Sequence, residues 1–318
     1  MAPRLLVTGA RGFVGRSAVP RFAAAGYEVV EVVRGEPVPA TGAAAAFRCD
    51  LTDGRAVAAT VAAARPDAVL HLAGVTYLPE VEANPVPSFA ANVLGTLNLL
   101  DAVLAHAPSA RVLVTSSCSV YGEVSASELP LHESSPLKAV HPYGVQKIGV
   151  ELVTARARSE RGLAATVARP FNHIGPGQDP RISFTHFARQ IVAAERGQAE
   201  PVLRVGNLSA RRDILDVRDV VEAYLALFAL PSPPPVVNVC SGTAVGIGEA
   251  LERLLAMARV ACRVATDPSR LRRLDTPELR GDAGLLRRLT GWAPRHPLDT
   301  TLARILDHVR AEHGGDAG

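Results

Sequence analysis

The sequence predicts an α/β protein with a doubly wound parallel sheet and a smaller C-terminal lobe. Its first half alternates short β-branched runs with longer amphipathic stretches, and a glycine-rich turn joins the first run to the first amphipathic stretch. The length of 318 residues is enough for two compact units. We expect residues 1–169 and 215–240 to form the sheet domain, and residues 170–214 and 241–318 to form the lobe.

The elements follow from this alternation. Short apolar runs predict strands at residues 4–8, 28–33, 68–72, 111–115 and 164–169. The amphipathic stretches predict helices at residues 13–25, 53–64, 89–106 and 143–160. Beyond residue 170 the pattern loosens, and it predicts a helix near 184–195, a short strand near 202–205 and a strand at 236–239 that could rejoin the sheet.

Composition excludes several classes of protein. The net charge of +3 is spread along the chain without a basic run, so nothing indicates nucleic-acid binding. An apolar run of about 18 residues, which a membrane span needs, is missing from the sequence. The four cysteines are scattered and the nine histidines lack metal-ligand spacing, which favours reduced thiols in the cytoplasm and no metal site.

The glycine-rich turn has the chemistry of a dinucleotide site. Gly9, Gly12 and Gly15 lie between the first strand and the first helix, with a spacing one residue wider at the front than the usual fingerprint. Backbone amides and the helix N-terminus there can approach a pyrophosphate. A purely structural turn is the alternative.

The end of the second strand bears on cofactor choice. The adenosine ribose lies at this point in dinucleotide-binding sheets, where a carboxylate suits a free 2′-hydroxyl and an arginine suits a 2′-phosphate. Arg34 follows the strand, which favours NADP(H) over NAD(H). NAD(H) remains possible because Glu31 is nearby, and Arg34 could also be an ordinary exposed strand-end residue.

Three further positions are candidates for cofactor contacts. Asp50 and Leu51 follow a third short strand, where they could meet the adenine amino group and ring. The fourth strand ends in Leu72, Ala73 and Gly74, whose small size permits backbone contact with the cofactor. Asn92 lies in an amphipathic helix and could be either a cofactor contact or a satisfied core amide.

A tyrosine and a lysine form the candidate catalytic pair. Only two of the 34 cationic residues are lysines, and Lys147 stands one helical turn after Tyr143. Its ammonium would favour the phenolate and lower the tyrosine pKa from about 10 towards the working range of a general acid. Arginine, with a broad planar fork, would not be equivalent. Such a pair also arises by chance on solvated helices.

The run at residues 115–122, Thr-Ser-Ser-Cys-Ser-Val-Tyr-Gly, ends the strand before that helix. With the glycine turn, the Leu72-Ala73-Gly74 segment and the Tyr143–Lys147 pair, the chain resembles the extended short-chain dehydrogenase/reductase family over nearly its whole length. The resemblance implies a Rossmann sheet and a catalytic hydroxyl at Ser117. It implies cofactor contacts at Gly9, Arg11, Gly12, Phe13, Val14, Gly15, Arg34, Asp50, Leu51, Leu72, Ala73, Gly74, Asn92, Thr115, Tyr143, Lys147 and Pro170.

The implied reaction is hydride transfer at a carbonyl carbon. Tyr143 would donate a proton to the developing alkoxide and Ser117 would hydrogen-bond the same oxygen. Lys147 would hold the nicotinamide ribose. The neighbouring hydroxyls of Thr115, Ser116 and Ser119 could instead be strand-end hydrogen-bonding groups.

The C-terminal half is similar to that of GDP-sugar members, the GDP-mannose 4,6-dehydratases and GDP-4-keto-6-deoxy-mannose reductases. The similar segments are residues 169–178, 205–213 and 238–242. This likeness implies a nucleotide-sugar substrate, with Arg212 facing the diphosphate. The implied substrate contacts are Ser117, Ser119, Asn172, Arg212, Arg272 and Asp275. The last four could also be solvated surface residues.

The subfamily depends on the residues after the catalytic hydroxyl. Dehydratases in this family carry a carboxylate there, but this chain has Cys118 and Ser119. We therefore expect a reductase of a 4-keto-6-deoxy sugar that uses NADPH. A 4-epimerase with tightly held NAD and a non-catalytic NADP-binding sensor are the alternatives. The helices that carry Asn92 and Tyr143 are rich in small apolar residues, and the resemblance implies a homodimer through them.

Overall fold

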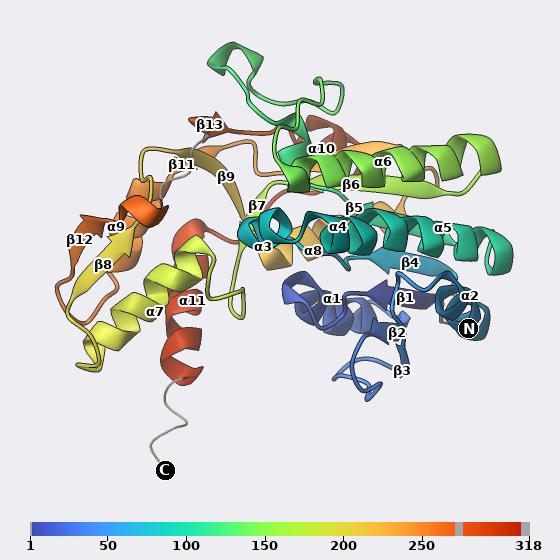
Figure 1. Cartoon of the computed structure of the whole chain (residues 1–318), viewed down its shortest axis with the longest axis horizontal. Coiled ribbons are helices and arrows are strands. Elements are labelled where there is room, and N and C mark those ends of the chain that lie inside the picture. Colours follow the sequence, from blue (N-terminus) through green and yellow to red (C-terminus); the bar gives the residue numbers. More distant parts are fainter. Residues whose placement is uncertain (1, 271–275, 313–318) are drawn as a thin grey trace.

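A parallel sheet forms the centre of the molecule (Figure 1). The computed structural model describes residues 2–270 and 276–312, and within them the largest sheet has seven strands in the order β10-β6-β5-β4-β1-β2-β3. Every neighbouring pair in it is parallel. The strands are β1 (Arg4–Thr8), β2 (Glu28–Val33), β3 (Ala45–Arg48), β4 (Ala68–His71), β5 (Arg111–Thr115), β6 (Ala165–Pro170) and β10 (Val236–Val239). This order reverses direction between β1 and β4, as in a doubly wound fold, and confirms the predicted fold class.

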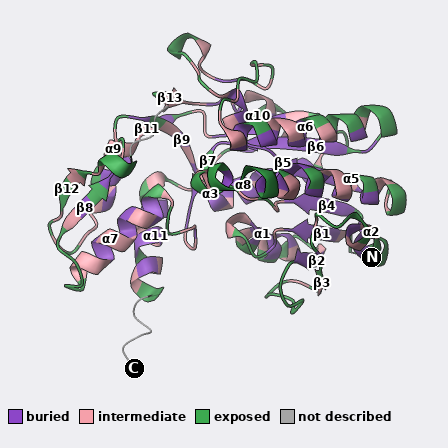
Figure 2. Cartoon of the chain, viewed as in Figure 1, coloured by how far each residue is buried: buried purple, intermediate pink, exposed green. Residues whose placement is uncertain are grey.

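Side-chain alternation along the strands builds a separate core on each face of the sheet. On β1, Leu5 and Val7 join one buried cluster, whereas Leu6 between them joins the other. The first cluster is closed by α1 (Phe13–Ala24), α8 (Val217–Ala229) and α10 (Gly284–Thr290), and the second by α2 (Gly54–Ala64), α5 (Gly95–His106) and α6 (Pro142–Arg161). Because both faces are covered, the strands other than the edge strand β3 are buried almost throughout (Figure 2).

The helical segment before β5 differs from its prediction. It begins at residue 85, four residues before the expected start, and consists of α4 (Pro85–Phe89), a π-helical turn (Ala90–Leu94) and α5. The short helix α3 (Leu78–Ala83) precedes it. Residues 85–106 are long and apolar enough to cross a membrane by composition, but half of the apolar window is buried inside the protein, as in a core helix.

Smaller sheets and three helices lie to one side of the large sheet, at the left of Figure 1. Strand β9 (Arg211–Asp216) pairs with β7 (Asn172–Ile174), β11 (Ala244–Gly246) and β13 (Glu278–Leu279), and β8 (Val202–Val205) pairs with β12 (Arg263–Thr266). The helices α7 (Ser183–Glu195), α9 (Ile247–Leu255) and α11 (Leu298–Glu312) enclose a third apolar core. The predicted helix near 184–195 and strand at 202–205 are both present.

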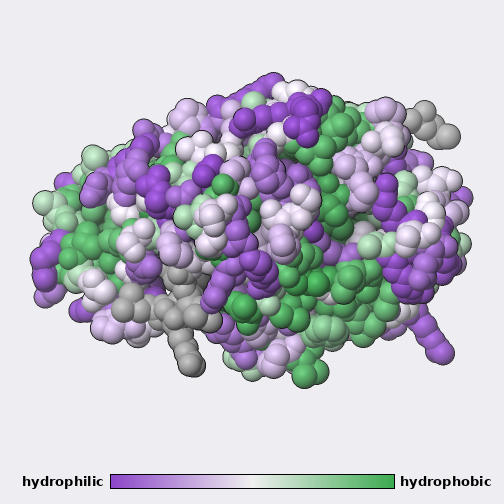
Figure 3. Space-filling model, turned by 90° about the horizontal axis from the view of Figure 1, so that it is seen from above, coloured by the Kyte–Doolittle hydropathy of each residue, from purple (hydrophilic) through white to green (hydrophobic). Residues whose placement is uncertain are grey.

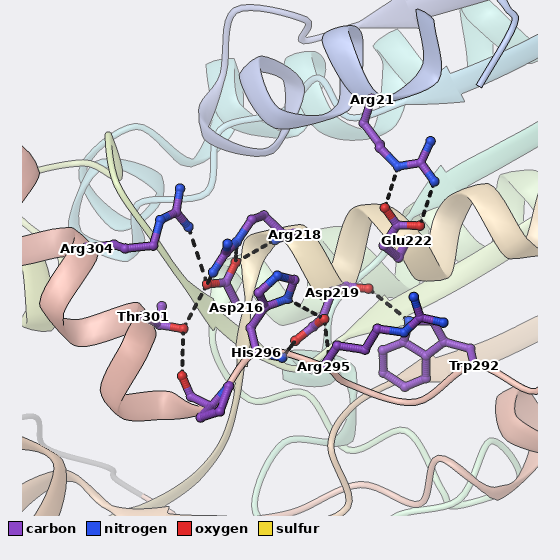
Figure 4. Close-up of polar contacts among 11 residues, drawn as sticks. Arg21, Asp216, Arg218, Asp219, Glu222, Trp292, Arg295, His296, Thr301 and Arg304 are labelled. Atoms are coloured by element: carbon purple, nitrogen blue, oxygen red, sulfur yellow. Dashed lines mark hydrogen bonds and ion pairs between the residues drawn. The ribbon is translucent and has the colours of Figure 1, made fainter. Parts of the chain in front are cut away.

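Two buried aspartates tie this region to the large sheet (Figure 4). Asp216 caps the N-terminus of α8, and its carboxylate also accepts a hydrogen bond of 2.8 Å from Thr301 on α11. Asp219, in the first turn of α8, accepts a 2.7 Å hydrogen bond from the ring of His296. Its carboxylate also accepts hydrogen bonds from the backbone amides of Arg295 and His296. These bonds fix the start of α11 against a helix that packs on the central sheet.

Candidate active site

The glycine turn packs tightly against the end of β4. Gly9 has a φ of +69°, and a Cβ atom there would lie 2.7 Å from the backbone nitrogen of Ala73. A Cβ atom on Gly15 would lie 2.3 Å from the carbonyl oxygen of Gly9. Only glycine therefore allows this close turn, which leaves backbone amides and the N-terminus of α1 accessible as a cradle for a pyrophosphate. The turn fits the predicted dinucleotide.

The predicted adenosine end is also assembled. Arg34 is exposed just beyond β2, and its positive charge contributes to a lowered pKa of Asp50, after the hydrogen bonds from Thr52. Arg11 reaches the same segment through a 2.6 Å hydrogen bond from its Nη2 to the carbonyl oxygen of Val38. Glu31 is fully buried and accepts a 3.1 Å bond from the amide of Ala40. An exposed arginine with an inward glutamate suits a phosphate at this point.

Asn92 joins the end of β4 to α6. Its side chain is buried, and its Oδ1 accepts a 2.8 Å bond from the amide of Val75 while its Nδ2 donates to the Val75 carbonyl at 3.0 Å and to Gln146 Oε1 at 2.7 Å. A Cβ atom on Gly74 would lie 2.8 Å from Asn92 Oδ1 and 3.9 Å from Lys147 Nζ. The amide is therefore fully engaged in fixing this loop, and a cofactor contact from Asn92 stays a prediction.

Ser117, Tyr143 and Lys147 come together at the carboxyl edge of the sheet. The Ser117 hydroxyl lies close enough to the Tyr143 phenol to lower its pKa, and the Lys147 ammonium lies 5.7 Å from the centre of the Tyr143 ring. Lys147 Nζ also donates a 2.9 Å bond to the carbonyl oxygen of Thr115 at the end of β5. All three side chains are at least nine-tenths buried. The constellation predicted from the sequence thus exists.

The electrostatics of the tyrosine differ from the prediction. We expected Lys147 to lower the pKa of Tyr143, but burial raises the pKa of this phenol, and the lowering contribution comes from the Ser117 hydrogen bond. The reason is that the phenol is desolvated, while the lysine ammonium is bonded to Thr115. Burial in turn lowers the pKa of Lys147 to about 8.

Two supporting residues were missed by the sequence analysis. His141 caps α6 by accepting a 3.1 Å bond from the Gly144 amide at Nδ1, and its ring stacks on Tyr143 with centroids 6.3 Å apart. Gln146 bonds Asn92 and donates a 2.9 Å bond to Ser88. The position of His141 directly before the first turn of the helix was the available signal for the cap.

The predicted substrate residues are only partly brought together. Arg212 on β9 lies close enough for its charge to act on Cys118, and it donates a 2.8 Å bond to the carbonyl of Thr276. The Ser119 carbonyl lies against Gly144 in the first turn of α6. Asn172 is exposed on β7. Arg272 and Asp275 lie outside the described residues.

The residues after Ser117 offer no strong acid. Cys118 is buried, and desolvation raises the pKa of its thiol to about 12. The side chain of Ser119 is a hydroxyl, and its backbone amide donates a 3.1 Å hydrogen bond to Ser117 Oγ. A carbonyl reduction needs no additional acid beyond the tyrosine, whereas loss of a sugar hydroxyl does.

Comparison with known proteins identifies the family. The sequence pattern of the NAD dependent epimerase/dehydratase family matches residues 5–240. The chain belongs to this family. It is 39% identical to GDP-6-deoxy-D-mannose reductase of Pseudomonas aeruginosa over 306 residues, which cover 96% of this chain and 97% of the relative. It is 27% identical to UDP-glucose 4-epimerase of Azospirillum brasilense over 340 residues, covering 100% of this chain and 95% of that protein.

A solved structure of the same family supports the fold. RMD from Pseudomonas aeruginosa, complexed with NADPH, superimposes with a TM-score of 0.87 at 37% identity and covers 98% of this chain and 99% of its own. The family resemblance stated from the sequence motifs is thereby confirmed. Catalytic work at Ser117, Tyr143 and Lys147 remains a prediction from the motifs and the geometry above.

Proposed function

We propose that this protein reduces the 4-keto group of a GDP-4-keto-6-deoxy sugar, with GDP-4-keto-6-deoxy-mannose as the favoured substrate and NADPH as the reductant. The observation that carries the proposal is the 39% identity, over nearly the full length of both chains, to a GDP-6-deoxy-D-mannose reductase. The NADPH complex of the similar RMD structure supports the cofactor, as does the exposed Arg34 beyond β2.

The cofactor would be held along the carboxyl edge of the sheet. The glycine turn at Gly9 and Gly15 receives the pyrophosphate, and Arg34 with Arg11 receives the 2′-phosphate. The small residues Ala73 and Gly74 leave room for the backbone approach that the inner ribose requires. When bound, NADPH supplies the hydride and its electron pair.

The residues of the chain would manage the oxygen of the substrate. Ser117 donates a hydrogen bond to the 4-keto oxygen, and Tyr143 passes its phenolic proton to that oxygen as negative charge develops there. Lys147 stabilises the tyrosinate that results. A raised pKa suits this role, because the phenol keeps its proton at neutral pH until a more basic alkoxide forms.

The site argues against dehydration, and the comparisons favour reduction over epimerisation. Dehydration needs an acid for the departing hydroxyl, and the buried thiol of Cys118 and the hydroxyl of Ser119 do not supply one. A 4-epimerase would use the same three residues but must retain its oxidised cofactor through a full cycle. The similarity to an epimerase is lower, at 27% identity, so epimerisation is the second candidate.

We further propose that the protein is a cytoplasmic homodimer. Five exposed apolar side chains line the outer surfaces of α4, the following π turn and α6: Val86, Phe89, Leu94, Val145 and Leu152, which are 40–77% exposed. Figure 3 shows apolar residues gathered on the side of the molecule where these helices lie. A second copy would bury this face by helix packing. The four cysteines are free thiols, as a reducing compartment requires.

We also propose that residues 170–214 and 241–318 form the nucleotide-sugar lobe. Arg212 lies in this part of the chain, on β9, close enough to Cys118 for its charge to act on the thiol. A guanidinium there can pair with the diphosphate of the substrate. The lobe therefore faces the catalytic residues of the sheet.

A panel of substrates tests the function. Purified protein is mixed with GDP-, dTDP- and UDP-linked 4-keto-6-deoxy sugars, each with NADPH or NADH, and consumption of the reduced cofactor is followed. We expect rapid oxidation of NADPH with the GDP compound only. Failure with all of the keto sugars, combined with interconversion of two nucleotide sugars without added NADPH, would instead establish the epimerase.

A further inference from the structure

A buried carboxylate lies directly behind the catalytic centre. Glu151 stands on α6 one helical turn after Lys147, and its side chain is 8% exposed. Its Oε1 accepts bonds from Ser116 Oγ at 2.5 Å and Arg169 Nε at 2.9 Å, and its Oε2 accepts a bond from Arg169 Nη2 at 2.7 Å. Both oxygens are therefore satisfied by groups on other elements.

These bonds join α6, which carries two of the predicted catalytic residues, to the ends of β5 and β6. Ser116 is the neighbour of Ser117 at the end of β5, and Arg169 is the neighbour of Pro170 at the end of β6. Glu151 shares α6 with Tyr143 and Lys147. One carboxylate thus sets the spacing of β5 and β6 from α6 at the edge where the reaction would occur.

The network also continues away from the site. Arg169 Nη1 donates a 3.0 Å bond to the hydroxyl of Tyr121, which donates a 2.6 Å bond to Asn238 Oδ1 on β10. The guanidinium also lies 5.1 Å from the centre of the Tyr121 ring. Arg169 is therefore held by Tyr121 as well as by Glu151. The guanidinium that binds the carboxylate is thus fixed in position.

The charge of Glu151 acts on Lys147. Lys147 lies one helical turn before Glu151 on α6 and 5.7 Å from the centre of the Tyr143 ring, and its charge acts on the buried His71 on β4, whose pKa burial lowers to about 3. Burial lowers the pKa of Lys147 and the Glu151 carboxylate opposes this change. Arg169 is ion-paired with Glu151, so a neutral residue at position 151 would leave the Arg169 guanidinium without its counter-charge beside α6.

We propose that Glu151 is a positioning residue for the reaction, which holds Ser117 in place through Ser116 and preserves the charge of Lys147. Stability alone does not explain the pair, because buried ion pairs add little stability compared with well-packed apolar side chains. The kinetic part of this inference rests on the proposed reductase function, whereas its effect on Lys147 does not.

The scarcity of lysine makes the electrostatic part measurable without substrate or cofactor. The protein contains only Lys138 and Lys147, so protein labelled with ¹³C at the lysine ε-carbons gives two signals, and Lys138→Arg identifies the one from Lys147. In Glu151→Gln we expect the Lys147 signal to titrate at lower pH than in the wild type. The double variant Glu151→Gln/Arg169→Met removes both charges and should return the titration towards the wild-type value.

Kinetics test the positioning. If the wild type reduces the GDP-keto sugar, Glu151→Gln should lower kcat by about 10- to 100-fold, the scale of a misplaced catalytic group, with little change in KM. The alkaline loss of activity should move to lower pH, because Lys147 is charged only below its pKa. Glu195→Gln is the control, since Glu195 is a buried partner of Arg310 on the distant α7 and α11.

The outcomes distinguish the inference about Glu151 from the proposed reductase function. An unchanged Lys147 titration in Glu151→Gln overturns the inference, whatever the enzyme activity. The same is true if Glu195→Gln alters the Lys147 titration and the pH profile as strongly as Glu151→Gln, because the effect would then reflect general destabilisation. A wild type inert towards keto sugars would defeat the proposed function but leave the Lys147 result to stand alone.

Discussion

At the scale of single residues, the buried phenol of Tyr143 determines the chemistry that this site can perform. The ring is stacked on His141 and buried beside Ser117, which restricts its position before any substrate enters. Burial keeps the phenol protonated, which is the state that a proton donor needs. In the proposed reaction, the nearby Lys147 would stabilise the anion formed after the proton has left.

Removing the phenolic hydroxyl tests this role. We expect Tyr143→Phe to lower kcat by at least about 100-fold, because the contribution of a positioned general acid is of that order. The dissociation constant for NADPH, measured by quenching of the single tryptophan or by calorimetry, should change little. Turnover close to that of the wild type would show that another group donates the proton.

Arg34 tests the choice of cofactor. Replacing Arg34 with Ala removes a charged partner for a 2′-phosphate, and such hydrogen bonds contribute about 1.5–3 kcal/mol. KM for NADPH should therefore rise by about 10- to 100-fold while KM for NADH stays nearly constant. Equal effects on both cofactors would mean that Arg34 does not contact the 2′-phosphate. Arg48 on β3 provides a control as another exposed arginine of the same edge.

At the scale of elements, strands β1, β2, β4, β5, β6, β8 and β10 were predicted almost to the residue because their signal is local, whereas no bounds were predicted for β3, β7, β9, β11, β12 and β13. Alternating or continuous β-branched residues identify β1, β2 and β5 directly, and the glycine turn identifies the start of α1. The π-helical turn at Ala90–Leu94 was not predictable in this way. It depends on Asn92, whose partners Val75 and Gln146 lie 17 and 54 residues away. Long-range hydrogen bonds of this kind leave no periodic pattern in the sequence.

The candidate site shows the same division. Ser117, Tyr143 and Lys147 belong to short motifs and were found from sequence alone. The pair of Glu151 and Arg169 was missed because its partners are separated by 18 residues and become neighbours only when α6 folds over β6. The pKa of Tyr143 was predicted in the wrong direction, since sequence spacing reveals a nearby lysine but not the loss of solvent.

Replacing Asn92 in the π turn tests how this segment is held. Asn92→Ala should destabilise the protein by about 1–3 kcal/mol, because the Val75 amide and Gln146 side chain lose their buried partner. The loop after β4 would loosen, so KM for NADPH should rise as well. Thermal unfolding and steady-state kinetics measure the two effects. Asn98→Ala, on the adjoining α5, is a control. Asn98 donates a hydrogen bond to the carbonyl of Leu51 and not to the loop after β4.

At the scale of the whole molecule, the large sheet leads into Ser117 just after β5, and β9 in the C-terminal region carries Arg212. The two parts are joined through Asp216 and Asp219 at the start of α8, which bind Thr301 and His296 (Figure 4). Because these carboxylates are buried, the joint resists bending. The exposed apolar face of α4 and α6 lies on the sheet domain, so pairing through it would leave this joint uncovered.

The proposed dimer has a direct test. Leu152→Glu places a charge in the centre of the apolar face and should convert a dimer to a monomer, because an unpaired charge is costly in a packed interface. Val264→Glu on β12, another partly exposed apolar position, should leave the oligomeric state unchanged. Light scattering after size exclusion gives both masses. A monomeric wild type would contradict the proposed homodimer.

The transfer of a hydride to the sugar is the central claim, and isotope labelling measures it most directly. NADPH that carries deuterium on the transferred side of its nicotinamide is incubated with the protein and GDP-4-keto-6-deoxy-mannose, and the product is analysed by mass spectrometry and NMR. We predict one deuterium at carbon 4 of the sugar, and a loss of this product with Tyr143→Phe. A 6-deoxy product without deuterium, or an unchanged keto sugar, would contradict the account.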